Sequence, residues 1–313
     1  MDFGQTTDTV ELSRLNFNLP LLTSPEEKIQ LERVSQAAKR SAQAQAIYVG
    51  VPVFNCQSWA GSFYPEGTES THFLREYSKQ LGSVELNSTF YSIPSAETFL
   101  KWKASVGSQF RFCPKFPKSI SHSLDGKHAD LNVFLERVQL LGENLGVCFL
   151  QLPQYFSIRD QDRLLSLLSV LPRELRTVIE VRNKEFFIDQ RLAPAWVENF
   201  SKRHVGAVSV DTPLEREVAH VSLTAVRTMI RFLGGNLHAS DFVRLRLWAK
   251  RIALWHVSGL KEVYFLIHEP NNETAPLVAK RMIQWINEEL ELLSSLYRIQ
   301  NVEWHSFFDE LID

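Results

Sequence analysis

The chain has 313 residues, of which 44% are hydrophobic and 22% charged, so it can bury a sizeable core and is not a predominantly disordered protein. A formal net charge of −2 gives no general attraction to nucleic acid or anionic lipid, so an anionic partner would have to be held by a local cluster. No apolar run approaches the roughly 18 residues that span a bilayer, and the N-terminus lacks a secretion-signal pattern, so we expect a cytoplasmic protein without a membrane partner.

The first segment, residues 1–46, carries no strand pattern. Ser24 followed by Pro25 has the form of a helix N-cap with proline in the first turn, and a polar, alanine-rich stretch continues to about Gln45. We expect a helical extension that covers one end of the domain or packs on a helix, rather than one that binds a partner.

From Ile47 onward, short apolar segments alternate with helix-length stretches. The predicted strands are residues 47–54, 83–91, 109–116, 145–153, 176–182, 205–211, 227–235 and 262–270. The predicted helices are residues 71–81, 97–106, 130–141, 158–171, 192–204, 242–258 and 275–293.

This alternation implies parallel strands joined by crossover connections. Eight strand segments within residues 47–293 match a (β/α)8 TIM-type barrel, an α/β fold in a single domain. No GxGxxG motif follows the first strand segment, so a dinucleotide-binding open sheet has little support. Residues 294–313, with aromatic residues at helical spacing, predict a C-terminal tail or helix packed on the barrel.

The three cysteines, Cys56, Cys113 and Cys148, are odd in number and far apart, and none is part of a CxxC pair. We expect buried free thiols rather than a zinc or redox site.

Strand alternation separates polar from apolar side chains, because successive residues face opposite sides of a barrel wall. In residues 83–91, Val84 and Leu86 fall on the helix-facing side, whereas Glu85, Asn87, Thr89 and Tyr91 fall on the side of the barrel axis. The same reasoning directs seven further polar residues and one histidine toward the axis: Lys115, Gln151, Glu180, Arg182, Ser209, Asp211, Arg231 and His268.

Charges around one axis must pair with each other or meet a ligand, since an unpaired buried charge is costly. An internal ion-pair lattice is one interpretation. We favour a functional site, because the polar residues gather at the carboxyl ends of the strands, where barrel enzymes build their sites. Lys115, Arg182 and Arg231 indicate an anionic ligand, since cationic side chains, and the arginine fork above all, fit phosphate or carboxylate.

Candidate catalytic residues are Glu85, Glu180, Asp211 and Lys115. Two carboxylates in unequal surroundings could divide into acid and base: one would stay ionised beside an arginine, while burial raises the pKa of the other. Glu85 and Glu180 are the candidates for this pair. His268 could be an acid or base, a metal ligand or, most simply, a satisfied interior histidine.

Five motifs carry a resemblance to a known family. They are the runs 84–91, 110–122, 150–153, 180–182 and 230–232. In order and spacing they resemble the YecE-like family, catalogued as domain of unknown function 72, from about Tyr48 to about Trp285. The resemblance implies a barrel but no established activity.

The resemblance implies the following positions for the site, all in the five motifs except Asp211: Glu85, Asn87, Thr89, Lys115, His122, Gln151, Glu180, Arg182, Asp211 and Arg231. The first strand departs from the family pattern, with Gly50-Val51-Pro52-Val53-Phe54 in place of Gly-Thr-Ser-Gly-Trp. The resemblance therefore gives no ligand contact from that strand.

Three functions compete. The leading hypothesis is an enzyme that acts on a small phosphorylated or carboxylated molecule by acid–base chemistry, in which Asn87, Thr89, Tyr91, His122, Gln151, Arg182, Arg231 and His268 bind the substrate. The second resembles divalent-metal sugar isomerases and endonuclease-four-type nucleases, with Glu85, Glu180, Asp211 and His268 as metal ligands. The third is a non-catalytic sensor of an anionic metabolite.

Overall fold

The computed structural model describes residue 12 and residues 15–20 and 24–297, with side chains through residue 294. Eight strands form one parallel sheet: β1 (Ala46–Val51), β2 (Ser83–Leu86), β3 (Arg111–Pro114), β4 (Cys148–Gln151), β5 (Thr177–Glu180), β8 (Gly206–Asp211), β9 (Arg227–Leu233) and β10 (Glu262–His268). Each strand corresponds to one of the eight predicted segments. A separate antiparallel pair, β6 (Phe187–Ile188) and β7 (Arg191–Leu192), lies in the connection after β5.

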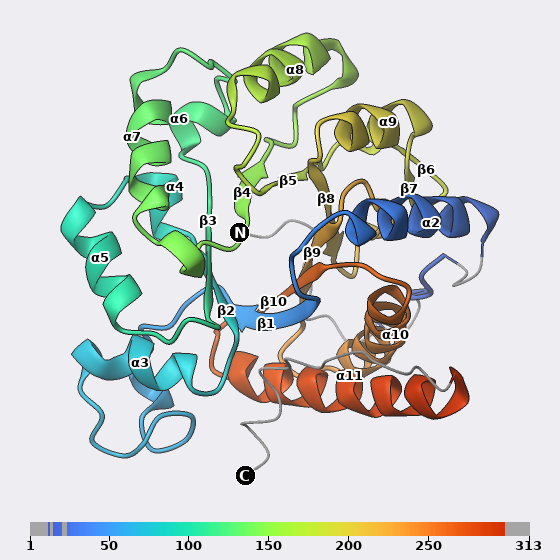
Figure 1. Ribbon diagram of the computed structural model, residues 1–313. Coiled ribbons are helices and arrows are strands. Elements are labelled where there is room, and N and C mark those ends of the chain that lie inside the picture. The colour runs from blue at the N-terminus through green and yellow to red at the C-terminus, as the bar shows by residue number, and fades with distance from the viewer. Residues whose placement is uncertain (1–11, 13–14, 21–23, 298–313) are drawn as a thin grey trace.

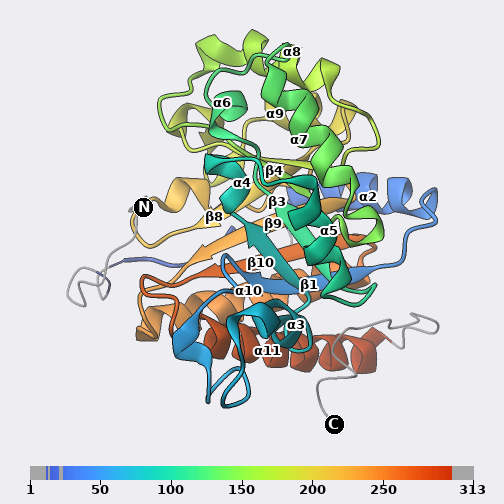
Figure 2. The ribbon, with the colours of Figure 1, turned by 90° about the vertical axis from the view of Figure 1, so that its left-hand side faces the viewer.

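The sheet closes on itself. The strands β1, β2 and β3 pair in chain order, as do β4, β5, β8, β9 and β10, and β10 pairs with β1. Two parallel bridges, Phe112 to Leu145 and Lys115 to Phe149, join β3 to β4 and complete the ring. The predicted (β/α)8 barrel is confirmed, and Figures 1 and 2 show its strands surrounded by helices.

The surrounding helices are α3 (Phe73–Ser78), α5 (Ala96–Ala104), α7 (Ala129–Gln139), α8 (Gln161–Val170), α9 (Pro194–Lys202), α10 (Ala239–Val257) and α11 (Ala275–Tyr297). All seven fall where helices were predicted, with ends shifted by a few residues. Two short helices, α4 (Ser88–Tyr91) and α6 (Lys118–Ser121), were not predicted. The C-terminal expectation concerns residues 294–313: residues 294–297 continue α11, and residues 298–313 lie outside the described part of the chain.

The connection between β8 and β9 departs from the regular pattern. Residues 212–226, all of which the structure describes, contain the single 3-10 turn Arg216–Val218 and no α-helix. The N-terminal helix α2 (Pro25–Lys39) lies there instead, between α9 and α10 (Figure 1). Its Gln30 accepts a hydrogen bond from the backbone N–H of Leu223 at 2.7 Å. A segment that precedes β1 thus completes the ring of helices.

Glu27 fastens α2 to α10. Its carboxylate is 2% exposed and accepts hydrogen bonds from Arg251 Nη1 at 2.5 Å and from Trp255 Nε1 at 2.9 Å. The start of the helix follows the predicted cap: the Ser24 hydroxyl accepts from the backbone N–H of Glu27, and Pro25 occupies the first turn. Through Glu27, α2 packs against α10, a helix of the barrel.

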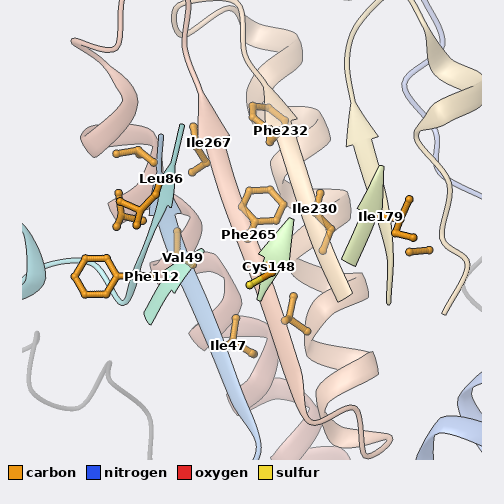
Figure 3. Packing of buried hydrophobic residues seen from close by; sticks show 14 of the residues in the cluster. Ile47, Val49, Leu86, Phe112, Cys148, Ile179, Ile230, Phe232, Phe265 and Ile267 are labelled. Atoms are coloured by element: carbon orange, nitrogen blue, oxygen red, sulfur yellow. The ribbon is translucent and has the colours of Figure 1, made fainter. Parts of the chain in front are cut away.

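The main core lies between the strands and the helices. Outward-facing residues such as Val49, Phe112, Ile230 and Phe265 are almost completely buried there, and Figure 3 shows part of this layer. A smaller cluster that includes Tyr48, Phe149, Met229 and Tyr264 fills the middle of the barrel. This apolar plug leaves polar side chains only toward the two ends of the barrel.

Two of the three cysteines, Cys113 and Cys148, are buried, and all three are free thiols. Cys56 is partly exposed, so the expectation of burial is wrong for this residue, which lies in the loop after β1. Among the described residues, no helix is both long and apolar enough to cross a membrane.

Candidate functional site

The carboxyl ends of the strands bring seven polar side chains together. They lie on the faces opposite to outward-packing residues such as Leu86 and Ile230, as strand alternation requires. We call this group the mouth cluster: Glu85, Lys115, Gln151, Glu180, Arg182, Arg231 and His268. All seven were predicted to face the axis. Their side chains come from β2, β3, β4, β5, β9 and β10 or from the residues directly after them.

Arg231 bridges two carboxylates from opposite parts of the wall. Its Nε and Nη2 donate to the two oxygens of Glu85 at 3.0 and 3.2 Å, and its Nη1 donates to Glu180 Oε2 at 2.9 Å. All three side chains are at most 6% exposed. The planar guanidinium presents donors on two edges, so one arginine pairs with both acids.

Both carboxylates are therefore held ionised. Burial opposes ionisation of Glu85, but the charge of Arg231 and the hydrogen bond from His268 outweigh it and hold its pKa well below the ordinary value. Burial is likewise outweighed at Glu180, where Arg182 and Arg231 lower the pKa. The predicted division into one ionised and one protonated carboxylate is wrong, because both acids share the same arginine.

His268 is hydrogen bonded to Glu85, with Nε2 3.0 Å from Oε2. Burial and the nearby Arg231 lower the pKa of His268, so the ring is neutral at neutral pH. A neutral ring beside an ionised carboxylate donates its Nε2 proton, which leaves Nδ1 as an acceptor with a lone pair. Glu85 thus orients a histidine whose other nitrogen is suited to act as a base.

Lys115 is the unpaired cation of the mouth cluster. It is 1% exposed, and its ammonium has no hydrogen bond or ion pair with any residue that the structure describes. Nζ lies 4.2 Å from the ring centroid of Phe90 and 5.6 Å from that of Phe149. Burial, together with the charge of Arg231, lowers the pKa of Lys115 to about 8.

Arg182 and Gln151 complete the cluster. Arg182 Nε donates a short hydrogen bond to Glu180 Oε1, and the side chain is 9% exposed. Gln151 is 5% exposed, and its Oε1 is buried without a hydrogen-bond donor among the described residues. With His268 neutral, three cations face two carboxylates in the mouth cluster. The excess of one positive charge favours an anionic ligand.

The residues expected after β2 do not follow strand geometry, because the chain turns into α4 at Ser88. The Thr89 hydroxyl lies 2.7 and 2.6 Å from the carbonyl oxygens of Leu86 and Lys115, so it fastens two chain segments rather than facing the axis. Tyr91 is 72% exposed. The alternation therefore gave the wrong direction for Thr89 and Tyr91, whereas Asn87 at the start of the turn is partly buried.

His122 follows α6, near the aromatic side chains of this part of the rim. Its ring lies 5.8 Å from Phe90 and 6.4 Å from Tyr155. Burial and the charge of Lys118 lower its pKa. The side chain is half-buried, with Nδ1 3.0 Å from the hydroxyl of Ser121. Its place is beside the mouth cluster, in contact with the ring that flanks Lys115.

Asp211 points the other way. Its carboxylate accepts from Arg216 at 2.6 Å, from Arg244 at 2.8 Å and from Trp248 Nε1 at 2.5 Å, so it lies behind the barrel wall against α10. On β8 the inward residues are Gly206, Val208 and Val210, so the residues that face the axis are one position away from those that we predicted. The prediction that Asp211 and Ser209 face the barrel axis is wrong.

The metal-site alternative finds no support in this geometry. Both oxygens of Glu85 and one oxygen of Glu180 accept hydrogen bonds from Arg231. The second oxygen of Glu180 accepts one from Arg182. Asp211 is not part of this group, because it lies against α10. Within the described part of the chain, no group of three or more histidine, cysteine or carboxylate residues is arranged to hold a metal ion.

Two further features escaped the sequence reasoning. Phe149 faces inward under Lys115, and its position two residues before Gln151 on the same strand was a signal that alternation could have used. Glu269 follows His268 and is 4% exposed, and burial with the nearby Asp241 raises its pKa to about 7. Nothing in the local sequence distinguishes Glu269 from an exposed loop carboxylate.

The comparisons with known proteins agree with the fold. Residues 48–301 match the family described as "Protein of unknown function DUF72". The UPF0759 protein YecE of Escherichia coli (strain K12) is 30% identical over 250 residues, which cover 74% of this chain and 89% of that protein. A solved DUF72 family protein from Thermotoga maritima has a TM-score of 0.63 at 22% identity and covers 79% of this chain and 100% of its own. One from Enterococcus faecalis has a TM-score of 0.62 at 19% identity, with coverage of 78% and 99%.

Proposed function

This chain belongs to the DUF72 family, whose function is unknown, and from the geometry of its mouth cluster we propose an enzyme that binds a small anionic molecule and acts on it by acid–base chemistry. The observation that carries the proposal is Lys115, a buried ammonium near Arg231 that pairs with no carboxylate in the described part of the chain. A ligand anion would supply the missing countercharge, since an unpaired buried charge is unstable. We also propose that the enzyme works in the cytoplasm.

The roles of the side chains follow from their pairing. Arg231 keeps Glu85 and Glu180 ionised, so these carboxylates position other groups instead of exchanging protons. His268, oriented by Glu85, is the proposed base through Nδ1. Lys115 is the proposed anion contact and proton carrier, since its pKa of about 8 lets it change charge near neutral pH.

Depth within the barrel limits the ligand. The exposed fraction rises from 1% at Lys115 through 5% at Gln151 to 9% at Arg182. A ligand that binds Lys115 must therefore fit among side chains that are themselves nearly buried. This favours a small molecule over a polymer and supports the metabolite hypothesis over the nuclease.

The test measures thermal unfolding with inorganic phosphate against chloride at equal ionic strength. Phosphate at about 100 times its dissociation constant should stabilise the protein by about 2.7 kcal/mol. The response should disappear in Lys115→Met and persist in Lys101→Met, where the lysine is exposed on α5 and pairs with Glu97. An equal phosphate response in the protein and in Lys115→Met would contradict the proposal.

A further inference from the structure

Lys115 and Gln151 face the mouth from neighbouring strands, and each has an unmatched polar atom. The Lys115 ammonium has no acceptor, and Gln151 Oε1 has no donor, among the residues that the structure describes. No hydrogen bond joins the two side chains, although the Lys115 segment bridges directly to Phe149 on the strand that carries Gln151. A ligand that satisfies both must accept at one atom and donate at another.

We infer that Lys115 forms an imine with the carbonyl group of a small oxo acid, and that Gln151 accepts a hydrogen bond from the hydroxyl of the intermediate. This inference rests on the proposed anion site and adds the substrate class. A carbonyl oxygen accepts from the ammonium, and after attack it becomes a hydroxyl that donates to Gln151 Oε1. The acid group of the same molecule balances the excess positive charge of the mouth cluster.

The surroundings of Lys115 suit a nucleophilic amine. Two aromatic rings flank Nζ. Desolvation and the charges of Arg231 and Arg182 favour the neutral amine, and they outweigh Glu85 and Glu180, which favour the ammonium. With a pKa of about 8 rather than 10.5, the neutral fraction at pH 7 is roughly 300-fold larger than for an ordinary lysine. The other two cations of the cluster are guanidiniums, which keep their charge and do not form imines.

The step balances without an outside reagent. The ammonium releases one proton, to the Nδ1 lone pair of His268 or to water, and the amine lone pair then bonds to the carbonyl carbon. A second proton moves from the nitrogen to the former carbonyl oxygen, which gives the carbinolamine. The released proton returns to the hydroxyl, which leaves as water while the nitrogen lone pair forms the C=N bond. Ammonium and carbonyl thus become iminium and water, with no net change in protons or electrons.

The experiment traps this iminium with sodium cyanoborohydride in the full-length protein, with pyruvate, glyoxylate and dihydroxyacetone phosphate as probes. Peptide mass spectrometry locates the reduced adduct. We expect at least one anionic probe to label Lys115 at least tenfold faster than any other lysine, whereas neutral acetone labels it slowly. The labelling rate should rise about tenfold per pH unit below pH 8 and level off above it.

Variants separate the amine from its setting. Lys115→Arg keeps the charge but loses the nucleophile, and Lys115→Met removes both, so neither should be labelled at this position. Gln151→Leu should slow labelling of Lys115 about tenfold and leave its pH midpoint unchanged, because it removes a hydrogen bond and not a charge. Circular dichroism checks that each variant is folded.

The outcomes distinguish this inference from the proposed function. If phosphate stabilises the protein but no probe labels Lys115 above the other lysines, the imine is wrong and the anion site stands. If acetone labels Lys115 as fast as the anionic probes, the amine is nucleophilic but the oxo-acid class is wrong. If phosphate does not stabilise and no probe labels Lys115, both proposals fail.

Discussion

Arg231 is the residue on which the charge balance of the barrel mouth depends. Its three hydrogen bonds reach carboxylates on β2 and β5, which are not neighbouring strands. Without Arg231, Glu85 would retain its hydrogen bond with His268, and Glu180 would retain its ion pair with Arg182. Each buried carboxylate would nevertheless lose the ion pair with Arg231.

We therefore expect Arg231→Met to lower the free energy of unfolding by about 3–5 kcal/mol, the cost of breaking a buried ion pair from one side. Arg231→Lys should recover part of this loss, since it keeps the charge without the fork. Urea denaturation at pH 7 measures both. The control is Arg246→Met, because Arg246 pairs with Glu288 at the surface and should contribute about 1 kcal/mol or less. Equal losses at the two positions would contradict the buried bridge.

Lys115 makes a different prediction, in which the dependence on pH is the signature. The folded protein releases the Lys115 proton near pH 8, whereas the unfolded chain keeps it until about pH 10.5. Between these values the unfolded state binds more protons, so stability rises with pH by up to about 3 kcal/mol from this group. Below pH 8 both states are protonated, and the folded state bears the full cost of the buried charge.

Lys115→Met should consequently be as stable as the wild-type protein or more stable at pH 7, and its advantage should shrink as the pH rises from 8 toward 10.5. Urea denaturation at pH 7, 8, 9 and 10 gives the difference in the free energy of unfolding between the two proteins. The contributions of other titrating groups are the same in both and cancel in this difference. Two curves that stay parallel across this range would show that the ammonium is not destabilised by its surroundings.

At the scale of elements, α2 takes the position of the helix that is missing between β8 and β9. It packs where the β8–β9 connection has only a 3-10 turn, and its contacts reach both neighbours: Arg33 donates to Ser201 of α9, and Glu27 binds Arg251 of α10. Three residues of α2 are buried, among them Val34 and Ala38. The outer side of the β8–β9 connection is thus covered by a segment from the start of the chain.

Glu27→Gln tests this arrangement, because it leaves Arg251 buried without its countercharge. We expect a loss of about 3 kcal/mol in the free energy of unfolding, followed by chemical denaturation. Glu32→Gln on the exposed face of the same helix should change stability by no more than about 0.5 kcal/mol. If the two substitutions behave alike, the Glu27–Arg251 pair does not stabilise the packing of α2 on the barrel.

At the scale of the whole molecule, the barrel buries charged side chains at both of its ends. The amino end has its own buried carboxylate, Glu262, which pairs with Arg176 at 3.2 Å and Arg227 at 3.4 Å. The apolar plug that includes Phe149 and Tyr264 separates this group from the mouth cluster. Both of these arginines at the amino end pair with Glu262, whereas Lys115 at the carboxyl end has no carboxylate within ion-pair distance among the described residues, so the two ends of one barrel differ in their capacity to hold an anion.

The overall charge of −2 predicts weak binding to duplex DNA at physiological salt, because such affinity requires many phosphates to be neutralised together. Fluorescence anisotropy with a labelled duplex at 50 and 200 mM salt would measure it, and we expect no binding at nanomolar protein concentration. Tight binding that survives the higher salt would argue for the nuclease alternative and against a small metabolite.

The sequence alone determined the barrel and the inward direction of all seven residues of the mouth cluster. Strand alternation has a fixed period of two, so a residue such as Ile230 that packs outward places Arg231 inward whatever its partners are. The alternation does not by itself determine which of the two sets of residues on a strand faces the axis. On β8 the polar residues were assigned to the axis, yet Asp211 faces α10, because Arg244 and Trp248 offer a buried carboxylate better partners there.

The tertiary structure decided the pairing of the charges. Which carboxylate meets Arg231 depends on the closure of the sheet, which brings β2, β5 and β9 around one axis although their residues are up to 146 positions apart in the chain. The same closure places Lys115 beyond ion-pair distance of every described carboxylate, and it leaves the β8–β9 side of the barrel for α2 to cover. Local patterns specify elements and faces, whereas distances between side chains on different strands exist only once the barrel has closed.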